Sequence, residues 1–313
     1  GRCLAFSSSS SCRRACAYSL PQGNHMRRIA IIGAGMTGLA AAYFLRGQSV
    51  EVFDEHGIGG GASGICGGLI HPYRGLVASE ESRAAFGKAK ALIGPFLKSP
   101  LIRMEKRKDL APEINFYSTC DASEWTAERI CGPAMVFKEG GVVDTPAYLQ
   151  DLFRRSGAKL ISEKVESLTD LSAFDAVVIA TGAAMGELVS LPHEVVYGRA
   201  LIYKCAPMPS GVLGPAYFAP LAEQCTVGAT FEHELDPKKL ADLKERAEGM
   251  APELKRLPKP DVVIGARLRG PARRPFVERI APGVWAAGGA GARGLLYHAS
   301  LGQRVAKEIL VDA

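Results

Sequence analysis

Two kinds of apolar pattern recur along the 313-residue chain: short unbroken runs, and longer stretches of helical composition or spacing. Residues 28–32, 50–53, 159–165 and 176–180 are short, rich in β-branched residues and bounded by turn formers, which predicts buried strands. Residues 37–46 are rich in Ala and Leu, and a helix is predicted to begin near Thr145 and Pro146. These elements predict a Rossmann-type α/β unit.

A second region has a different pattern. Residues 195–232 alternate in the manner of strands, and Asp236 with Pro237 starts a predicted helix whose apolar stripe runs to Leu254. We expect a small α+β unit on an antiparallel or mixed sheet. The first unit is predicted to be discontinuous, with residues 26–78, 139–192 and 262–313, and the second to comprise residues 79–138 and 193–261.

The turn after the first predicted strand carries a nucleotide-binding pattern. Gly33, Gly35 and Gly38 form GxGxxG between strand and helix, and Asp54 follows the second strand. The first glycine permits a tight turn, the second lets a pyrophosphate approach the backbone, and the third lets the helix pack on the strand. The helix N-terminus favours phosphate, and a carboxylate at Asp54 can bind a ribose and disfavours a 2′-phosphate. The pattern predicts a dinucleotide site that is not for NADP.

A second glycine-rich loop follows the acid directly. Residues 57–75 read GIGGGASGICGGLIHPYRG, and a flavin, which is longer than a nicotinamide cofactor, needs more close contact with backbone. A third glycine cluster precedes the predicted C-terminal helix, residues 295–310, whose N-terminal N–H groups would stabilise negative charge on a reduced flavin. We therefore predict FAD as the cofactor.

Composition changes this picture little, except at the N-terminus. Residues 1–25 are Ser-rich and contain Arg2, Arg13 and Arg14 without an acid, so the rest of the chain carries a net charge of +3 against +6 for the whole. This composition is typical of a transit peptide, and predicts an organellar location, in a plastid (chloroplast) rather than a mitochondrion. A disordered tail is the alternative, with a cytoplasmic location. The remaining charge is weak support for nucleic-acid binding.

Cysteine usage and hydropathy exclude other classes. The five cysteines after the leader are widely spread and form no metal-ligand pattern, so we expect no metal site. No apolar run approaches the ~18 residues of a membrane span. The pattern does not determine the oligomeric state.

Four separated blocks resemble the D-amino-acid-oxidase-like FAD-dependent oxidoreductases. They are IIGAGMTGLAAAYFL, VEVFDEHGIGGGASGICGGLIHP, VVIATGAA and residues 264–302, and together they span both ends and the middle of residues 26–313. Within that group the chain is similar to the FAD domain of the bifunctional tRNA 5-methylaminomethyl-2-thiouridine biosynthesis protein and to glycine-oxidase-like enzymes.

The resemblance implies a set of cofactor contacts distributed over the three glycine clusters and two connecting strands. Those expected in the first half of the chain are Gly33, Gly35, Met36, Thr37, Gly38, Asp54, Glu55, Gly60, Ala62, Ser63, Gly67, Gly68 and Leu69. Those expected in the second half are Val165, placed in a predicted strand, Thr181, Gly182, Gly289, Gly291, Arg293, Gly294, Leu295 and Leu296.

The resemblance also implies that Arg267 binds a substrate carboxylate, for which a guanidinium fork is well suited. Ala272 stands where the family commonly has Asp, which leaves the order of this loop and the choice of substrate open. His298, at the start of the last helix, is a second candidate for substrate contact. The implied reaction is hydride transfer from a C–H beside an amine nitrogen to flavin N5, with a small amine or amino acid as substrate.

Two alternatives stay open from the sequence. The protein could trim the carboxymethylaminomethyl group of a tRNA wobble uridine, although no methyltransferase half is present and the basic charge is small. It could also be a non-catalytic flavin-binding subunit, because the second unit is short. Neither the electron acceptor nor covalent attachment of the flavin, for which Cys66 is the nearest thiol, is determined by the pattern.

Overall fold

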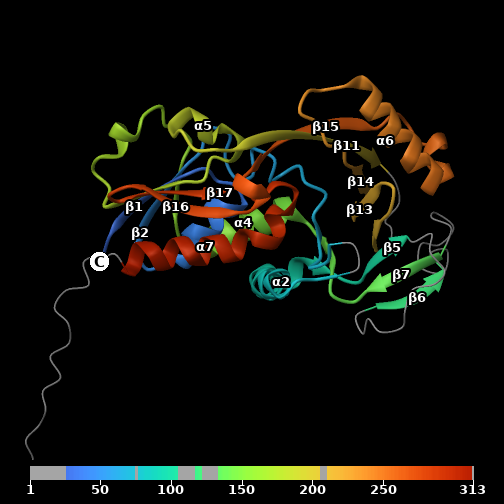
Figure 1. The fold of residues 1–313 in the computed structure, drawn as a ribbon, viewed down its shortest axis with the longest axis horizontal. Coiled ribbons are helices and arrows are strands. Elements are labelled where there is room, and N and C mark those ends of the chain that lie inside the picture. The colour runs from blue at the N-terminus through green and yellow to red at the C-terminus, as the bar shows by residue number, and fades with distance from the viewer. Residues whose placement is uncertain (1–25, 75–76, 105–116, 122–132, 205–209, 312–313) are drawn as a thin grey trace, which may run out of the picture.

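The computed structural model describes residues 26–74, 77–104, 117–121, 133–204 and 210–311. The leader, residues 1–25, for which a transit peptide was predicted, lies outside them. Two units are joined side by side, each built on its own sheet (Figure 1). In the described ranges, none of the helices combines the length and apolar character needed to cross a membrane.

The first unit is a six-stranded sheet in the order β16-β17-β10-β1-β2-β9. Its strands are parallel apart from the β16–β17 pair. Their bounds are β1 (Arg28–Ile32), β2 (Ser49–Phe53), β9 (Lys159–Ile161), β10 (Ala176–Ile179), β16 (Phe276–Ala281) and β17 (Val284–Gly288). Because both faces are covered, β1 and β10 are almost wholly apolar, as the short runs predicted.

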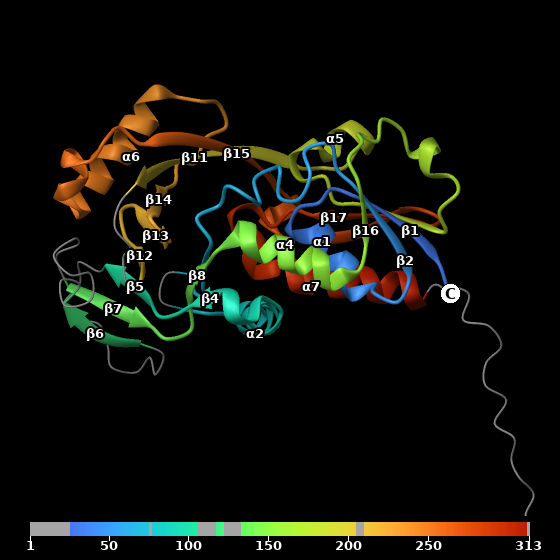
Figure 2. The same cartoon turned by 180° about the vertical axis from the view of Figure 1, so that it is seen from behind.

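Four helices share the largest apolar core, which lies on one face of this sheet (Figure 2). They are α1 (Met36–Phe44), α2 (Glu80–Ile93), α4 (Thr145–Ser156) and α7 (Gly294–Val311), and α2 reaches the core by packing on α7. The other face packs on a smaller core with α5 (Met185–Leu188) and the 3-10 turn η2 (Leu168–Leu171); the 3-10 turn η3 (Gly182–Ala184) directly precedes α5. Asp144 caps α4 by accepting a hydrogen bond from the Ala147 N–H, and Gly157 ends that helix in a left-handed conformation.

The second unit is an eight-stranded, mainly antiparallel sheet in the order β15-β11-β14-β13-β12-β5-β7-β6. Its strands are β5 (Leu101–Met104), β6 (Tyr117–Asp121), β7 (Pro133–Phe137), β11 (Glu194–Lys204), β12 (Gly211–Leu213), β13 (Tyr217–Leu221), β14 (Gln224–Gly228) and β15 (Asp261–Arg269). One face is covered by α6 (Pro237–Met250), which Asp236 caps as predicted, followed by η4 (Pro252–Arg256).

A three-stranded sheet connects the two units. It has the order β3-β8-β4, with β3 (Leu69–Ile70), β4 (Leu97–Lys98) and β8 (Gly141–Val143). Three further 3-10 turns are η1 (Gly94–Phe96), η5 (Pro271–Arg273) and η6 (Gly291–Arg293). The predicted combination of a Rossmann-type unit with a mixed-sheet α+β unit is therefore confirmed.

Three local predictions need correction. Residues 80–93 were placed in the second unit, but the apolar stripe of α2 (Phe86, Ala89, Leu92) packs in the core of the first. Residues 262–269 were placed in the first unit, but nine residues of β15 pair with β11 in the second sheet. Val165 lies outside any strand, because pairing with β2 ends at Ile161; the Val165 side chain is buried under the first sheet instead.

Candidate functional site

The first glycine cluster forms a tight turn between β1 and α1. Gly33 has a φ of +108°, and a Cβ there would lie 2.5 Å from the Ala180 carbonyl oxygen. A Cβ on Gly38 would overlap the Gly33 carbonyl, so the turn and helix touch through bare backbone. Only glycine satisfies both contacts, as the fingerprint predicted.

Two side chains hold this turn in place. Asp54, at the end of β2, accepts hydrogen bonds from the N–H groups of Ala34 (2.8 Å) and His56 (2.9 Å). Ser63, in the second glycine-rich loop, accepts one from the Met36 N–H at the start of α1 (3.1 Å). The second loop thus crosses the N-terminus of α1, which is the position in a Rossmann-type unit where phosphates bind.

The neighbouring turn after β10 carries a polar group with no partner. The hydroxyl of Thr181 is buried and makes no hydrogen bond. Gly182, beside it, has a φ of +60°, and a Cβ there would meet no atom within 4 Å. A buried hydroxyl next to open space at the carboxyl edge of a parallel sheet fits contact with a polar ligand.

The C-terminal glycine cluster lies beside the first one. Gly294 starts α7, and a Cβ on it would lie 3.6 Å from the Met36 sulfur. Arg293 donates a hydrogen bond to the Pro72 carbonyl (3.2 Å), and burial lowers the pKa of its guanidinium. Leu295 and Leu296 are buried in the core, so at these positions only backbone can face a ligand. The structure therefore brings the predicted clusters together.

The remaining predicted cofactor residues differ in exposure. Gly60 and Glu55 are exposed, and the Glu55 carboxylate lies 3.7 Å from the His56 ring. Gly35 faces only Ser63, and Gly289 adopts a φ of +79°. The others are buried or of intermediate exposure: Thr37, Ala62, Gly67, Gly68, Leu69 and Gly291.

The prediction that His298 contacts substrate is not supported by its position. The ring is 0 % exposed and is held at both nitrogens, by the Leu295 carbonyl (2.8 Å) and the Tyr148 hydroxyl (2.6 Å). A carbonyl only accepts, so Nδ1 carries the proton and Nε2 accepts from Tyr148. Burial lowers the pKa of His298 to about 4. The residue is a neutral link between α7 and α4.

His71 lies between the two units. Its Nδ1 is buried without a hydrogen-bond partner, and its ring stacks on Tyr73. Burial, together with the charges of Arg293 and Arg103, lowers the pKa of His71 to about 4. A neutral imidazole thus lies among cations directly after the second glycine-rich loop.

The second sheet meets that loop through Gly228 and Gly265, which the sequence analysis did not single out, and through Gly67, which it named only as a cofactor contact. A Cβ on Gly265 of β15 would press on Ala62 and Ile65 of the loop. A Cβ on Gly67 or on Gly228 would overlap the ring of Tyr217. Glycines inside apolar strand patterns were the available signal, because a strand glycine often marks close approach of other groups.

Arg267 and Tyr217 lie on this face of the sheet. The guanidinium of Arg267 covers Gly198 on the neighbouring strand, where a Cβ would collide with it. The positive charge of Arg267 lies close enough to Cys66 and Tyr217 to interact electrostatically with both side chains. Burial raises the pKa of Tyr217 to about 12, so its hydroxyl stays protonated at neutral pH. Burial also raises the pKa of the Cys66 thiol, which favours the neutral thiol over the nucleophilic thiolate.

The two arginines of β15 have different surroundings. Arg269 forms a 2.8 Å ion pair with Glu194. No ion pair or hydrogen bond holds the half-buried Arg267 within the part of the chain that the structure describes. A guanidinium without a carboxylate partner, facing a glycine-lined junction, can bind a carboxylate from outside.

Comparisons with known proteins agree with this geometry. The chain is 25% identical over 306 residues to the tRNA 5-methylaminomethyl-2-thiouridine biosynthesis bifunctional protein MnmC of Maricaulis maris, covering 90% of this chain and 52% of that protein. The chain thus spans about half the length of this relative. Glycine oxidase from Bacillus cereus shares the fold with a TM-score of 0.76 at 18% identity, over 91% of this chain and 97% of that one. Iminodiacetate oxidase from Chelativorans sp. BNC1 does so with a TM-score of 0.74 at 22% identity, over 91% and 95%.

The family assignment rests on nearly the whole described chain. The model of the family described as FAD dependent oxidoreductase (DAO) matches residues 28–308, which include all three glycine clusters and both sheets. The buried, unpartnered Thr181 hydroxyl and the bare-backbone turn at Gly33 fit the diphosphate of an elongated dinucleotide. The chain belongs to the FAD dependent oxidoreductase family, its cofactor is FAD, and it is an oxidoreductase.

Proposed function

We propose that the protein oxidises the C–N bond of a small amine that bears a carboxylate. Bound FAD would supply the two-electron oxidant, as hydride acceptor, for the C–H beside the amine nitrogen, and water would hydrolyse the imine that this leaves. The names of two proteins that share the fold, glycine oxidase and iminodiacetate oxidase, support this substrate class.

The observation that carries the proposal is the placement of Arg267. Its guanidinium lies over Gly198, beside Tyr217 and the loop that contains Cys66. Removing charge from water in a half-buried site is unfavourable unless a partner is supplied, and a substrate carboxylate would supply it. The other arginine of this strand with a similar position, Arg269, already has Glu194.

The chain's own residues would act by orientation and exclusion of water. Arg267 would hold both carboxylate oxygens in its fork, which fixes the adjacent carbon. The protonated Tyr217 hydroxyl can donate a further hydrogen bond to the same carboxylate. Hydride transfer from a neutral amine requires no strong base, so a dyad of acid and base is not part of the proposal.

The test is anaerobic reduction of the bound flavin across amino acids and N-substituted glycines. Arg267→Leu should raise the KM or Kd for carboxylate amines by about 100-fold, the loss of a charge-assisted bidentate contact, while the protein stays yellow. Arg269→Leu is the matched control and should change KM less than about threefold. Unchanged kinetics in Arg267→Leu would mean that another group holds the carboxylate, and failure of every amine to bleach the flavin would favour a non-catalytic flavin subunit.

A second candidate is oxidative trimming of the carboxymethylaminomethyl group of a tRNA wobble uridine. The 25% identity to the MnmC protein favours it, although the chain spans only half of that protein. Phosphate contacts by Lys and Arg make tRNA affinity fall steeply with salt. Filter binding with total tRNA at two salt concentrations separates the candidates, because absence of salt-sensitive binding would remove this one.

A further inference from the structure

The segment after β14 continues along β11 and carries an exposed aromatic side chain. Thr230 N–H donates to the Arg199 carbonyl (3.0 Å), and Tyr197 and Glu232 exchange two backbone hydrogen bonds (2.7 and 3.0 Å). This pairing places Phe231 opposite Gly198, on the other side of β11 from Arg267. Since successive residues of a strand face opposite sides, Phe231 and Glu232 point away from one another.

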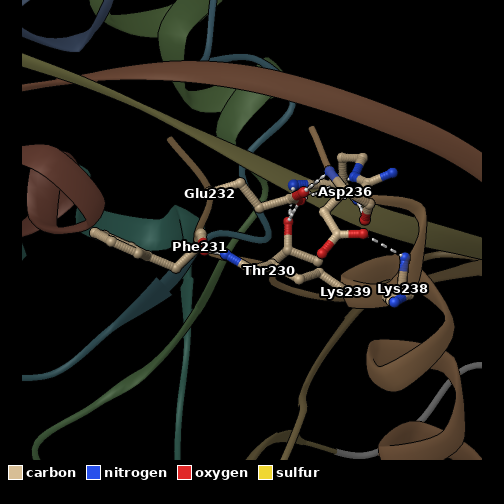
Figure 3. Close-up of polar contacts among 7 residues, drawn as sticks. Thr230, Phe231, Glu232, Asp236, Lys238 and Lys239 are labelled. Atoms are coloured by element: carbon tan, nitrogen blue, oxygen red, sulfur yellow. Dashed lines mark hydrogen bonds and ion pairs between the residues drawn. The ribbon is translucent and has the colours of Figure 1, made fainter. Parts of the chain in front are cut away.

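A buried polar cluster fixes that orientation. Glu232 is 0 % exposed and accepts hydrogen bonds from the Arg199 guanidinium (2.9 and 2.7 Å) and from the Asp236 N–H (2.8 Å). The Thr230 hydroxyl also donates to it. Burial raises the pKa of Glu232, but these bonds outweigh it and lower the pKa to about 2. Figure 3 shows the Phe231 ring directed away from this cluster.

The Phe231 ring lies on the opposite face of the sheet from this cluster, which is the face that carries the proposed carboxylate site. Phe231 is 49 % exposed, and its ring centroid lies 5.1 Å from the Arg269 guanidinium carbon. Gly198, opposite Phe231, is the residue that the Arg267 guanidinium covers. The Phe231 ring thus lies on the same face of the sheet as the Arg267 guanidinium, packed on Arg269 and edge-on to the His233 ring (centroids 5.7 Å). About half of its surface remains in water, which is unfavourable for an apolar ring.

We propose that Phe231 determines specificity by contacting a flat apolar substituent of the substrate. The proposal rests on the proposed function: Arg267 takes the carboxylate, and Phe231 takes an aromatic or similar group attached to the amine nitrogen or to the carbon beside it. The Arg199–Glu232 pair acts as a brace that keeps the ring on the site face. The preferred substrate class is therefore aromatic-substituted amino acids or N-substituted glycines rather than glycine itself.

Ligand binding to the FAD-loaded protein tests this without turnover. Calorimetric titration with acetate and with phenylacetate compares a carboxylate alone with a carboxylate that carries a ring. Phe231→Ala should raise the Kd of phenylacetate about tenfold, the worth of one aromatic contact, and change that of acetate less than twofold. Leu235→Ala, an equally exposed position (49 %) on the same loop, is the matched control and should change neither.

Two results would overturn the proposal. One is an unchanged Kd for phenylacetate in Phe231→Ala, and the other is an equal increase in the Kd of phenylacetate and of acetate. Phe231→Leu keeps an apolar side chain and should lose affinity for phenylacetate to an intermediate extent. This graded effect distinguishes loss of the ring from a folding defect in the alanine variant. Arg267→Leu should weaken both ligands. If it weakens neither, the assignment of the carboxylate site fails, whatever the result at Phe231.

Turnover supplies a second readout. The kcat/KM of Phe231→Ala should fall about tenfold for N-benzylglycine and less than twofold for sarcosine. Equal changes for both substrates would overturn the role of Phe231. If neither substrate reduces the flavin while the binding difference persists, the proposed reaction fails and the ring-binding role stands.

Discussion

The glycines of the β1–α1 turn and those of the second sheet are both crowded, but by different kinds of neighbour. A Cβ on Gly33 or Gly38 would meet backbone atoms directly after β10 or of the turn itself. A Cβ on Gly198 or Gly228 would meet side chains, the Arg267 guanidinium and the Tyr217 ring. Backbone cannot move without breaking the turn, whereas a side chain can rotate, so the first set should be needed for cofactor binding and the second for the position of substrate groups.

The two units also differ in their buried polar pairs, one of which is neutral and the other charged. In the first unit His298 and Tyr148 form a neutral pair that links two helices in the core. In the second, Arg199 and Glu232 form a charged pair that orients one segment of the sheet. The buried His298 resists protonation in the folded protein, whereas the unfolded chain takes up the proton. The free energy of unfolding of the first unit therefore depends on pH through this pair.

The largest effect is expected at the first turn. Gly38→Val should displace the backbone of Gly33 and lower the flavin content of the purified protein at least ~10-fold, because the phosphates lose the helix N-terminus. The ratio of absorbance at 450 nm to that at 280 nm measures this. Gly249→Val, at a position with open space around it, is the matched control. A fully yellow Gly38→Val protein would contradict the role of backbone contact.

Acid should destabilise the first unit through His298. Its pKa is about 4 when folded and near 6.5 when unfolded, so the unfolded chain binds the extra proton. The resulting stability is complete above pH 6.5 and falls as the pH drops toward 4, by up to ~3 kcal/mol.

Denaturant midpoints between pH 5 and 7.5 for the native protein and His298→Gln measure this contribution. The pKa of His71 is lowered in the same direction, so His71 also makes stability rise with pH. The contribution of His298 is therefore measured by the difference between the pH profiles of the two proteins. Parallel curves for the two would show that His298 does not titrate as its burial requires.

A smaller effect is expected at the second set of glycines. Gly198→Ala should push the Arg267 guanidinium aside and raise the KM for carboxylate amines about tenfold, because a fork contact depends on orientation. Flavin content should stay unchanged, which distinguishes this glycine from Gly38. Loss of flavin in Gly198→Ala would remove the distinction between the two sets.

The smallest effect is expected at Gly249, near the end of α6. Nothing lies within 4 Å of a Cβ there, and alanine is favoured over glycine in a helix by up to ~1 kcal/mol. Gly249→Ala should therefore raise the melting temperature slightly and leave the KM unchanged. A lower melting temperature would indicate crowding at that position.

The sequence by itself determined the elements whose signals are local. Apolar runs and glycine spacing predicted β1, α1, β2 and the turn with Asp54, because the residues that form this strand–turn–helix–strand unit follow one another along the chain. The caps at Asp144 and Asp236 were readable for the same reason. The glycine clusters and the match of family blocks sufficed to predict FAD.

Only the tertiary structure decided which distant residues share a face. The packing of α2 on α7, the pairing of β15 with β11, and the burial of His298 depend on residues far apart in sequence, for which local pattern carries no signal. Likewise, the sequence named Arg267 but not Gly198 or Tyr217, and it did not reveal that Phe231 lies opposite Gly198. Strand register sets such neighbours, and a shift of one residue would turn each of these side chains to the other face.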